Sequence, residues 1–306
     1  MSQKDVGRLH PYRINLRFNK SMEPLIRNIS DTARWVAIYR AQESERPDAV
    51  FYDPFARKLA GERGQQIADA IQFTSKNSWS FVARTFLFDE FIMQHVEQGY
   101  DMVVNLASGL DARPYRMSLP SSLRWIEVDL PGIMDYKESV LKNEKPVCRL
   151  QSVRLDLADK DARQELFEEL NSECNKALIV CEGLIGYLDD ESAGSLARDL
   201  SDQLHFRRWV FDLMSPGLLK MIRKEMGSFL EEANAPLQFA PAEGEGFFLN
   251  YGWKSLQSKS KLKTAAMLKR LSDEMIGFAN YPEPEGPKGD FPWTGVCLFE
   301  NIHGTI

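Results

Sequence analysis

An acidic residue and a glycine-containing turn stand at the ends of two apolar segments, at a spacing that suits nucleotide binding. Residues 102–107 form an apolar run that breaks into Ser108 and Gly109, which is typical of a buried parallel strand ending in a tight turn. Small residues there let the backbone approach a ligand closely. A second apolar segment ends at Asp129, 20 positions after Gly109, about the separation at which an acidic strand tip meets ribose hydroxyls. Together they predict a site for a cofactor that contains adenosine.

Several other charged residues could either bind a ligand or stabilise the fold. Glu182 lies inside an apolar stretch, where an unpaired carboxylate is costly to bury, so we expect it to face a cleft or a charged partner. Arg84 falls in an amphipathic helix, where arginine is usually solvated. Asp156 either contacts a ligand or caps the helix after it. Asp111 and Arg113 are expected to pair with each other or with the N-terminal helices, in a structural role.

Strands and helices alternate through the middle of the chain. The patterns predict strands at 102–107, 124–129, 148–155, 176–181 and 207–213, with helices near 132–143, 159–173 and 189–204 between them. This alternation is typical of a mostly parallel sheet with helices on both faces, the α/β Rossmann-like class.

Regions of different character flank this alternating core. Before it, we predict an irregular arm at 1–27 and helices from 29, from 53 to 71 and at 79–98, which would cap the sheet edge. After it, we predict a helix at 216–233, a mobile loop at 234–246, a helix near 264–277 and a closing strand at 294–300. The expected organisation is one domain over 1–306, with a helical cap at 1–99, a cofactor-binding core at 100–213, and a substrate lid with closing strands at 214–306.

Composition excludes several classes of partner. The formal net charge of −6 argues against a nucleic-acid-binding surface. No uncharged apolar run approaches the ~20 residues that span a bilayer, and the N-terminus shows no secretory signal. The four cysteines lack paired spacing, and the four histidines show no motif with a nucleophile or a metal-spaced acid. We therefore expect a cytoplasmic protein with no metal site, no disulfide framework and no Ser-His-Asp device.

Four blocks in residues 31–190 resemble the leucine carboxyl methyltransferase-like family of class I S-adenosylmethionine-dependent methyltransferases, which includes polyketide O-methyltransferases. The first block is TARWVA at 32–37, with RAQES at 40–44 and DPFA at 53–56. The second is VART at 82–85 with Asp89. The third is VVNLASGLDAR at 103–113, continuing to YR at 115–116 and EVDLP at 127–131. The fourth is CEGLIGYL at 181–188. Each is weak alone, and their shared order and spacing carry the resemblance. It implies a class I methyltransferase sheet of about seven strands with an N-terminal helical cap and an inserted lid.

The resemblance implies roles for particular residues toward S-adenosylmethionine. Arg84 would hold the carboxylate of the methionine part, for which a planar guanidinium fork is suited. Asp129, with Leu130 beside it, would bind the ribose. The implied cofactor-binding set is Arg84, Ala107, Ser108, Gly109, Asp129, Leu130, Asp156, Leu157 and Glu182.

The remaining roles divide between the two ends of the cofactor. The turn at 107–109 would pass its backbone along the methionine part. Asp156 would accept from the adenine amino group, and the Leu157 backbone would complete that contact. Glu182 would lie beside the sulfonium and the substrate entrance, and Tyr187 would line the pocket; these two form the implied catalytic set.

The chain departs from the family pattern at two places. Ala107 stands where the family usually has the first glycine of the turn, and its methyl is tolerable if its φ is negative. Ala33 stands nearest to a lysine that in the family is a second carboxylate-binding cation, which leaves Arg34 as the substitute.

The predicted function is methyl transfer to a hydroxyl or carboxyl oxygen of a small molecule. The nearest alternative is methylation of a protein C-terminal carboxyl group. A nicotinamide-dependent dehydrogenase would also use an acid after the second strand, but its fingerprint needs a third glycine where this chain has Ala112. A silent cofactor-binding module is the remaining alternative.

Overall fold

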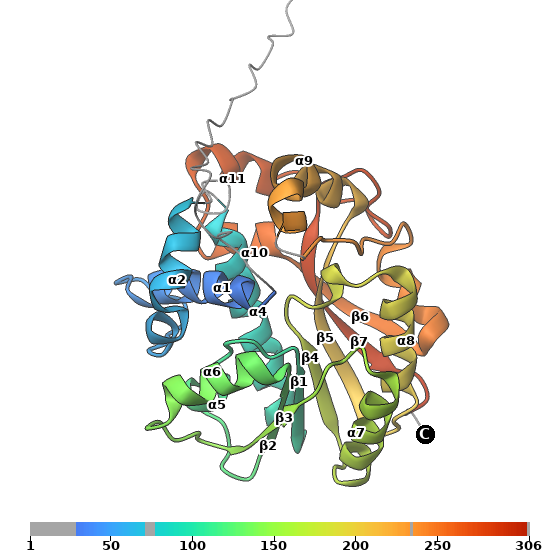
Figure 1. The fold of residues 1–306 in the computed structure, drawn as a ribbon. Helices are drawn as coiled ribbons and strands as arrows, with labels where there is room; N and C mark the ends of the chain where they lie inside the picture. Colours follow the sequence, from blue (N-terminus) through green and yellow to red (C-terminus); the bar gives the residue numbers. More distant parts are fainter. Residues whose placement is uncertain (1–28, 71–76, 233–234, 305–306) are drawn as a thin grey trace, which may run out of the picture.

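A seven-stranded sheet forms the centre of the protein (Figure 1). The computed structural model describes residues 29–70, 77–232 and 235–304. The strands follow the order β3-β2-β1-β4-β5-β7-β6; β1 to β5 run parallel, and β7 is antiparallel to both of its neighbours. Their bounds are Met102–Leu106, Arg124–Asp129, Arg149–Arg154, Ala177–Cys181, Phe206–Met214, Trp253–Ser260 and Thr294–Asn301 for β1 to β7. This is the expected class I methyltransferase arrangement.

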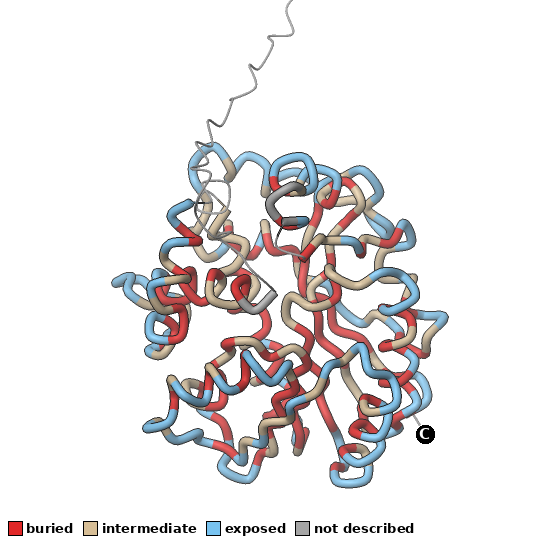
Figure 2. Tube along the Cα trace, viewed as in Figure 1, coloured by how far each residue is buried: buried red, intermediate tan, exposed pale blue. Residues whose placement is uncertain are grey.

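The central strands form because their residues are apolar on both faces. Every residue of β1 and of β4 is buried, as expected of parallel strands covered by helices on two sides (Figure 2). The chain order along the sheet reverses between β1 and β4, and a ligand-binding crevice is expected outside the carboxyl ends at such a point.

The sequence analysis missed β6. This strand lies at the edge of the sheet, pairs only with β7 and carries mostly polar, exposed residues, so it lacks the apolar pattern of the inner strands. A bulge between Ser255 and Gln257 further breaks its alternation.

Helices cover both faces of the sheet. α7 (Lys160–Ser172) and α8 (Asp190–Ser201) pack on one face, where Phe167 and Leu196 join the core formed with β1, β2 and β4. α4 (Ser78–Glu97) packs on the opposite face through residues such as Phe88 and Phe91. α6 (Pro131–Leu141) follows β2, and the short helices α5 (Arg113–Arg116) and η1 (Ile185–Tyr187) follow β1 and β4. The three helices predicted between strands are therefore confirmed.

The N-terminal helices α1 (Ile29–Ser44) and α2 (Ala56–Ala70) pack against each other beside the carboxyl edge of the sheet (Figure 1). Gly61 interrupts α2 with a φ of +60°. The third predicted helix of the cap, α4, is also part of the helical layer on one face of the sheet, because its apolar residues pack in the core there. The predicted arm at 1–27 lies outside the described residues.

The region after β5 differs from its prediction. α9 (Pro216–Glu232) is confirmed, but the predicted loop at 234–246 gives way at 244 to a 3₁₀ helix, η2 (Gly244–Tyr251). The single helix expected near 264–277 is wrong, because α10 (Lys261–Met267) and α11 (Asp273–Ala279) are separate. Lys269 between them has a φ of +58°, in the left-handed region that ends helices, and the Arg270 side chain is buried in an ion pair with Glu43 of α1. No described helix is both long enough and apolar enough to cross a membrane.

Candidate active site

A cavity of about 1070 Å³ opens at the carboxyl edge of the sheet, where the strand order reverses. Segments that follow β1, β2, β3 and β4 form one side of it, and α1, α4 and α9 contribute to the other. All the residues predicted for the cofactor line this cavity, as does Tyr187. The fold therefore brings the predicted residues together, although they are spread over about 100 positions of the chain.

The turn after β1 has an unusual backbone. Gly109 has a φ of +51°, which glycine adopts readily. Ala107 has a φ of +52°, so the condition that its φ be negative is not met. A residue with a Cβ in the left-handed region costs roughly 1–2 kcal/mol, because the Cβ crowds the following carbonyl oxygen. The turn keeps the shape of a glycine turn at this cost, which indicates that surrounding contacts fix the backbone.

Asp129 holds the turn after β1 to the turn after β2. Its Oδ2 accepts a hydrogen bond from the Gly109 N–H at 2.6 Å, and its Oδ1 accepts from the Leu130 N–H at 2.7 Å. Burial raises the pKa of this carboxyl above its usual value, against the opposing effect of the two N–H groups. A carboxylate has about four acceptor sites, so each oxygen can accept one further hydrogen bond. The predicted contact with two ribose hydroxyls fits this geometry.

The segment after β3 forms the next part of the wall. Asp156 is exposed, and its Oδ1 accepts from the Ala158 N–H at 3.0 Å. The cap of α7 is Asp159 instead, whose side chain accepts from the Ala162 N–H, so the capping interpretation of Asp156 is wrong. The Leu157 carbonyl accepts from Arg163 Nη1 at 2.7 Å, which ties this segment to α7.

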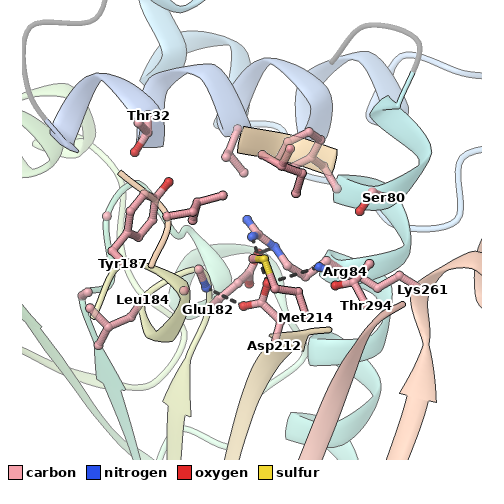
Figure 3. A pocket seen from close by; sticks show the side chains of 18 of the residues that line it. Thr32, Ser80, Arg84, Glu182, Leu184, Tyr187, Asp212, Met214, Lys261 and Thr294 are labelled. Carbon is pink, nitrogen blue, oxygen red and sulfur yellow. Dashed lines mark hydrogen bonds and ion pairs between the residues drawn. The ribbon is translucent and has the colours of Figure 1, made fainter. Parts of the chain in front are cut away.

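Arg84 and Glu182 meet at the base of the cavity (Figure 3). Arg84 Nε donates to Glu182 Oε1 at 3.1 Å, and Arg84 Nη1 donates to Asp212 Oδ2 at 3.4 Å. Glu182 Oε2 also forms an ion pair with Arg113 Nη2 at 2.8 Å. Glu182 was expected to face a cleft or a charged partner, and it does both. Two of the three nitrogens of the Arg84 guanidinium, Nε and Nη1, therefore contact protein carboxylates.

Arg113 is the centre of a buried ion-pair network. Its guanidinium contacts Asp111 at 2.8 Å and Asp89 of α4 at 2.6 Å, in addition to Glu182. Its side chain is 2% exposed. The structural role predicted for Asp111 and Arg113 agrees with these contacts, since they join the end of β1 to the N-terminal helices.

Asp212 and Lys261 were missed by the sequence analysis. Asp212 lies on β5 and accepts hydrogen bonds from the Gly183 N–H at 2.7 Å and from Lys261 Nζ at 3.2 Å. Although burial acts to raise the pKa of Asp212, Lys261 and Arg84 lower it to about 2. A carboxylate inside the apolar segment 209–214 was the signal for Asp212, the same signal that identified Glu182. Lys261 follows directly after β6, and no apolar segment surrounds it in the sequence to mark it in this way.

Two further predictions concerned Tyr187 and Arg34. Tyr187 lines the cavity, and burial raises the pKa of its hydroxyl. Arg34 is not a substitute for the missing lysine, because its guanidinium stacks 3.5 Å from the centre of the Tyr136 ring and is not part of the cavity wall. Two other cations lie near Arg84: Arg113, which shares Glu182 with it, and Lys261, which shares Asp212 with it.

Comparison with known proteins identifies the family. The sequence pattern of leucine carboxyl methyltransferases matches residues 33–201, more than half of the chain. The chain belongs to the leucine carboxyl methyltransferase family. The family expected from the four sequence blocks is therefore confirmed.

Relatives of this family span much of the chain. One of Frankia alni is 28% identical over 278 residues, covering 85% of this chain and 91% of its own length. Another, of Streptomyces coelicolor, is 31% identical over 184 residues, covering 56% of this chain and 64% of its own. Both carry the name "Putative S-adenosyl-L-methionine-dependent methyltransferase". These names agree with the expected cofactor.

A solved structure supports the fold. The crystal structure of a duf574 family protein from Streptomyces avermitilis superposes with a TM-score of 0.56 at 14% identity, over 88% of this chain and 97% of that chain. At this identity the likeness concerns the architecture alone.

Proposed function

We propose that this protein transfers the methyl group of S-adenosylmethionine to an oxygen of a small molecule. The observation that carries the proposal is the turn at 107–109 bound to Asp129, at the point where the strand order reverses. The turn offers a close backbone approach, and Asp129 offers free acceptor sites 20 positions away. Family membership supports the same cofactor.

The residues around the cavity fit the cofactor part by part. Asp129 would accept from the ribose hydroxyls, and the segment 155–158 would hold the adenine. The turn at 107–109 would contact the methionine part, whose carboxylate would accept from Nη2 of Arg84. The bidentate grip expected of Arg84 is replaced by a single contact, since Nε and Nη1 bind Glu182 and Asp212.

The chemistry requires alignment more than proton transfer. The cofactor supplies an activated methyl on a sulfonium, and an acceptor oxygen displaces it in line. Positioning contributes up to ~7–11 kcal/mol of barrier lowering in ideal intramolecular cases. Glu182 would orient the reacting end through its two arginine contacts, and it is too heavily paired to act as a free base. Tyr187 would close the other side of the acceptor site.

Binding of S-adenosylhomocysteine tests the cofactor assignment. We expect Asp129→Ala to weaken its affinity roughly a hundredfold or more, since hydrogen bonds to a charged group contribute about 1.5–3 kcal/mol each. Asp135→Ala is the matched control, because Asp135 lies nearby on α6 with its side chain 65% exposed and outside the cavity wall. Titration calorimetry measures both variants. Unchanged affinity in Asp129→Ala would show that the cofactor lies elsewhere.

The acceptor class requires an activity assay. Phenols and small carboxylic acids should accept labelled methyl groups, whereas methylation confined to peptides at their C-terminal carboxyl group would favour the protein-modifying alternative. Thermal unfolding with NAD and NADP in parallel tests the dehydrogenase, because a ligand at ~100 times its dissociation constant adds ~2.7 kcal/mol of stability. Stabilisation by a nicotinamide nucleotide alone would contradict the proposal.

A further inference from the structure

A buried ion pair joins β2 to α6 next to the turn that carries Asp129. Lys137 of α6 donates from Nζ to Glu127 Oε1 of β2 at 2.7 Å, and the two side chains are 2% and 1% exposed. Removing two charges from water costs about as much as their attraction returns, so such a pair adds little net stability. Stability is therefore a weak explanation for this pair, and the place of its charges needs another.

The pair is positioned by the same two elements that present Asp129. Side chains alternate along β2, so Glu127 and Asp129 project from the same face of the sheet. α6 begins soon after Asp129, and Ile133 in its first part lines the cavity. Lys137 follows Ile133 by one helical turn and so shares its side of the helix. The ammonium group therefore lies behind the part of the cavity wall that Asp129 belongs to.

The charge of Lys137 acts on the carboxylates around this part of the cavity. Burial raises the pKa of Asp129, and Lys137 opposes the rise together with two backbone N–H groups. Although burial also acts to raise the pKa of Asp111, Arg113 and Lys137 hold it below its usual value. Lys137 therefore favours the ionised form of the acid that is predicted to bind the ribose.

Glu127 does not cancel this charge at lower pH. Burial raises the pKa of Glu127 to about 7 in spite of the opposing effect of Lys137. Below that pH Glu127 increasingly holds a proton, whereas a lysine ammonium stays charged. The pair then carries a net positive charge beside Asp129.

The remaining charged groups on the elements around Asp129 are exposed or held in ion pairs: Asp111, Asp135, Glu138, Arg154, Asp156 and Lys160. Arg154 lies opposite Asp129 in the register of β2 and β3, but its guanidinium binds two carboxylates of α6 at the surface. Charges exposed to water are screened, and buried charges are screened much less. Among the described residues, the buried cation that acts on Asp129 is therefore Lys137.

We propose that Lys137 is a positioning residue for cofactor binding, whose buried ammonium keeps the Asp129 carboxylate ionised so that it accepts from both ribose hydroxyls. This inference rests on the proposed function. An ionised carboxyl has about four acceptor sites, and N–H groups take two of them here. A proton on the carboxyl would occupy one of the remaining sites, so only one hydroxyl could donate to it.

The pH dependence of S-adenosylhomocysteine binding tests this role. Removing Lys137 alone would leave Glu127 buried without its partner, so the test variant is Glu127→Met/Lys137→Met, which replaces both charges by apolar side chains. We expect its affinity to be close to that of the wild type at about pH 8 and roughly tenfold weaker at about pH 6, because Asp129 then binds a proton at a higher pH. Titration calorimetry measures both proteins.

Three further variants make the result specific. Glu127→Gln keeps the ammonium and can still accept its hydrogen bond, so it should keep the wild-type pH profile. Glu127→Gln/Lys137→Gln is a second neutral pair and should reproduce the profile of the double methionine variant. Lys142→Met is the matched control, since Lys142 follows α6, is exposed and does not line the cavity. Urea unfolding shows that each variant is folded.

The outcomes separate a role through charge from a purely structural one. An equal loss of affinity at both pH values in the two neutral pairs would mean that the ion pair only holds the turn in place, and it would overturn the inference. Wild-type affinity at both pH values in these variants, or the same pH-dependent loss in Glu127→Gln, would also overturn it. Failure of the wild type to bind S-adenosylhomocysteine, or unchanged affinity in Asp129→Ala, would instead overturn the proposed function, so the two failures are distinguishable.

Discussion

The two halves of the cavity are built in different ways. In the half formed by the ends of β1 and β2, the Asp129 side chain binds backbone: it accepts from the N–H of Leu130, one position away, and from the N–H of Gly109, 20 positions away. In the half that contains Lys261, side chains contact side chains from distant segments, such as Arg84 and Asp212, 128 positions apart. Backbone contacts leave a pattern in the local sequence. Long-range ion pairs do not.

The largest expected effect concerns the network that joins the two halves. Arg113→Gln removes a buried cation that contacts three carboxylates and leaves their charges uncompensated, so we expect a loss of roughly 3–5 kcal/mol in the free energy of unfolding. Urea unfolding measures it. Arg124→Gln is the control, because this arginine is paired with Glu173 at the surface and should cost about 1 kcal/mol or less. Equal losses in both variants would mean that the network does not support the cavity.

A smaller effect should appear in the pH dependence of stability. The pKa of Asp212 lies at about 2 in the folded protein against an ordinary value of 3.8. A lowered pKa stabilises the folded state above the ordinary value, and this contribution is lost as the pH falls from about 4 to about 2. One pKa unit corresponds to 1.36 kcal/mol, so the contribution is about 2 kcal/mol.

Asp212→Asn isolates this contribution from that of other carboxyl groups. We expect the stability difference between wild type and Asp212→Asn, measured by urea unfolding, to shrink by about 2 kcal/mol between pH 5 and pH 2. A difference that stays constant over this range would contradict the pairing of Asp212 with Lys261 and Arg84.

The smallest expected effect on stability comes from the turn after β1. Ala107→Gly removes the crowding of a Cβ at a φ of +52°, worth roughly 1–2 kcal/mol, but gives the unfolded chain about 0.4–1 kcal/mol of extra entropy. We expect a net stabilisation between about 0 and 1.6 kcal/mol in thermal unfolding, with closer cofactor approach and tighter S-adenosylhomocysteine binding.

Lys269→Gly is the matched control for this substitution. Lys269 has a similar φ of +58° but does not line the cavity, so it should be stabilised without a change in cofactor affinity. Tighter binding in both variants would show that the change does not arise at the turn after β1.

Much of the fold could be predicted because burial leaves a mark on residue type. β1 and β4 are buried along their whole length and were predicted within a residue or so from their apolar runs. β6 is an edge strand with polar residues and left no such mark. The helix predicted at 264–277 is broken at Lys269, whose φ is +58°, next to the ion pair of Arg270 with Glu43 of α1.

The residues of the candidate site were also easiest to predict where they lie next to a buried strand. Residues that follow buried strands, such as Asp129 and Glu182, were found because a charge at the end of an apolar run is conspicuous. Arg34 was chosen by its proximity in sequence to a family position, and the helix turns it onto Tyr136. Lys261, which shares Asp212 with Arg84, lies beyond residue 201, where the match to the family pattern ends.

By itself, the sequence determined where the buried strands lie in the chain. It also determined the turn and the acidic residue that suit an adenosine cofactor, and the family. Only the tertiary structure decided which charges meet: that Glu182 lies between two arginines, that Asp212 joins Arg84 to Lys261, and that the apolar residues of α9 face them. The physical reason is range. Burial and backbone conformation act on each residue and its neighbours, whereas an ion pair depends on where two distant segments come to lie after the whole sheet has formed.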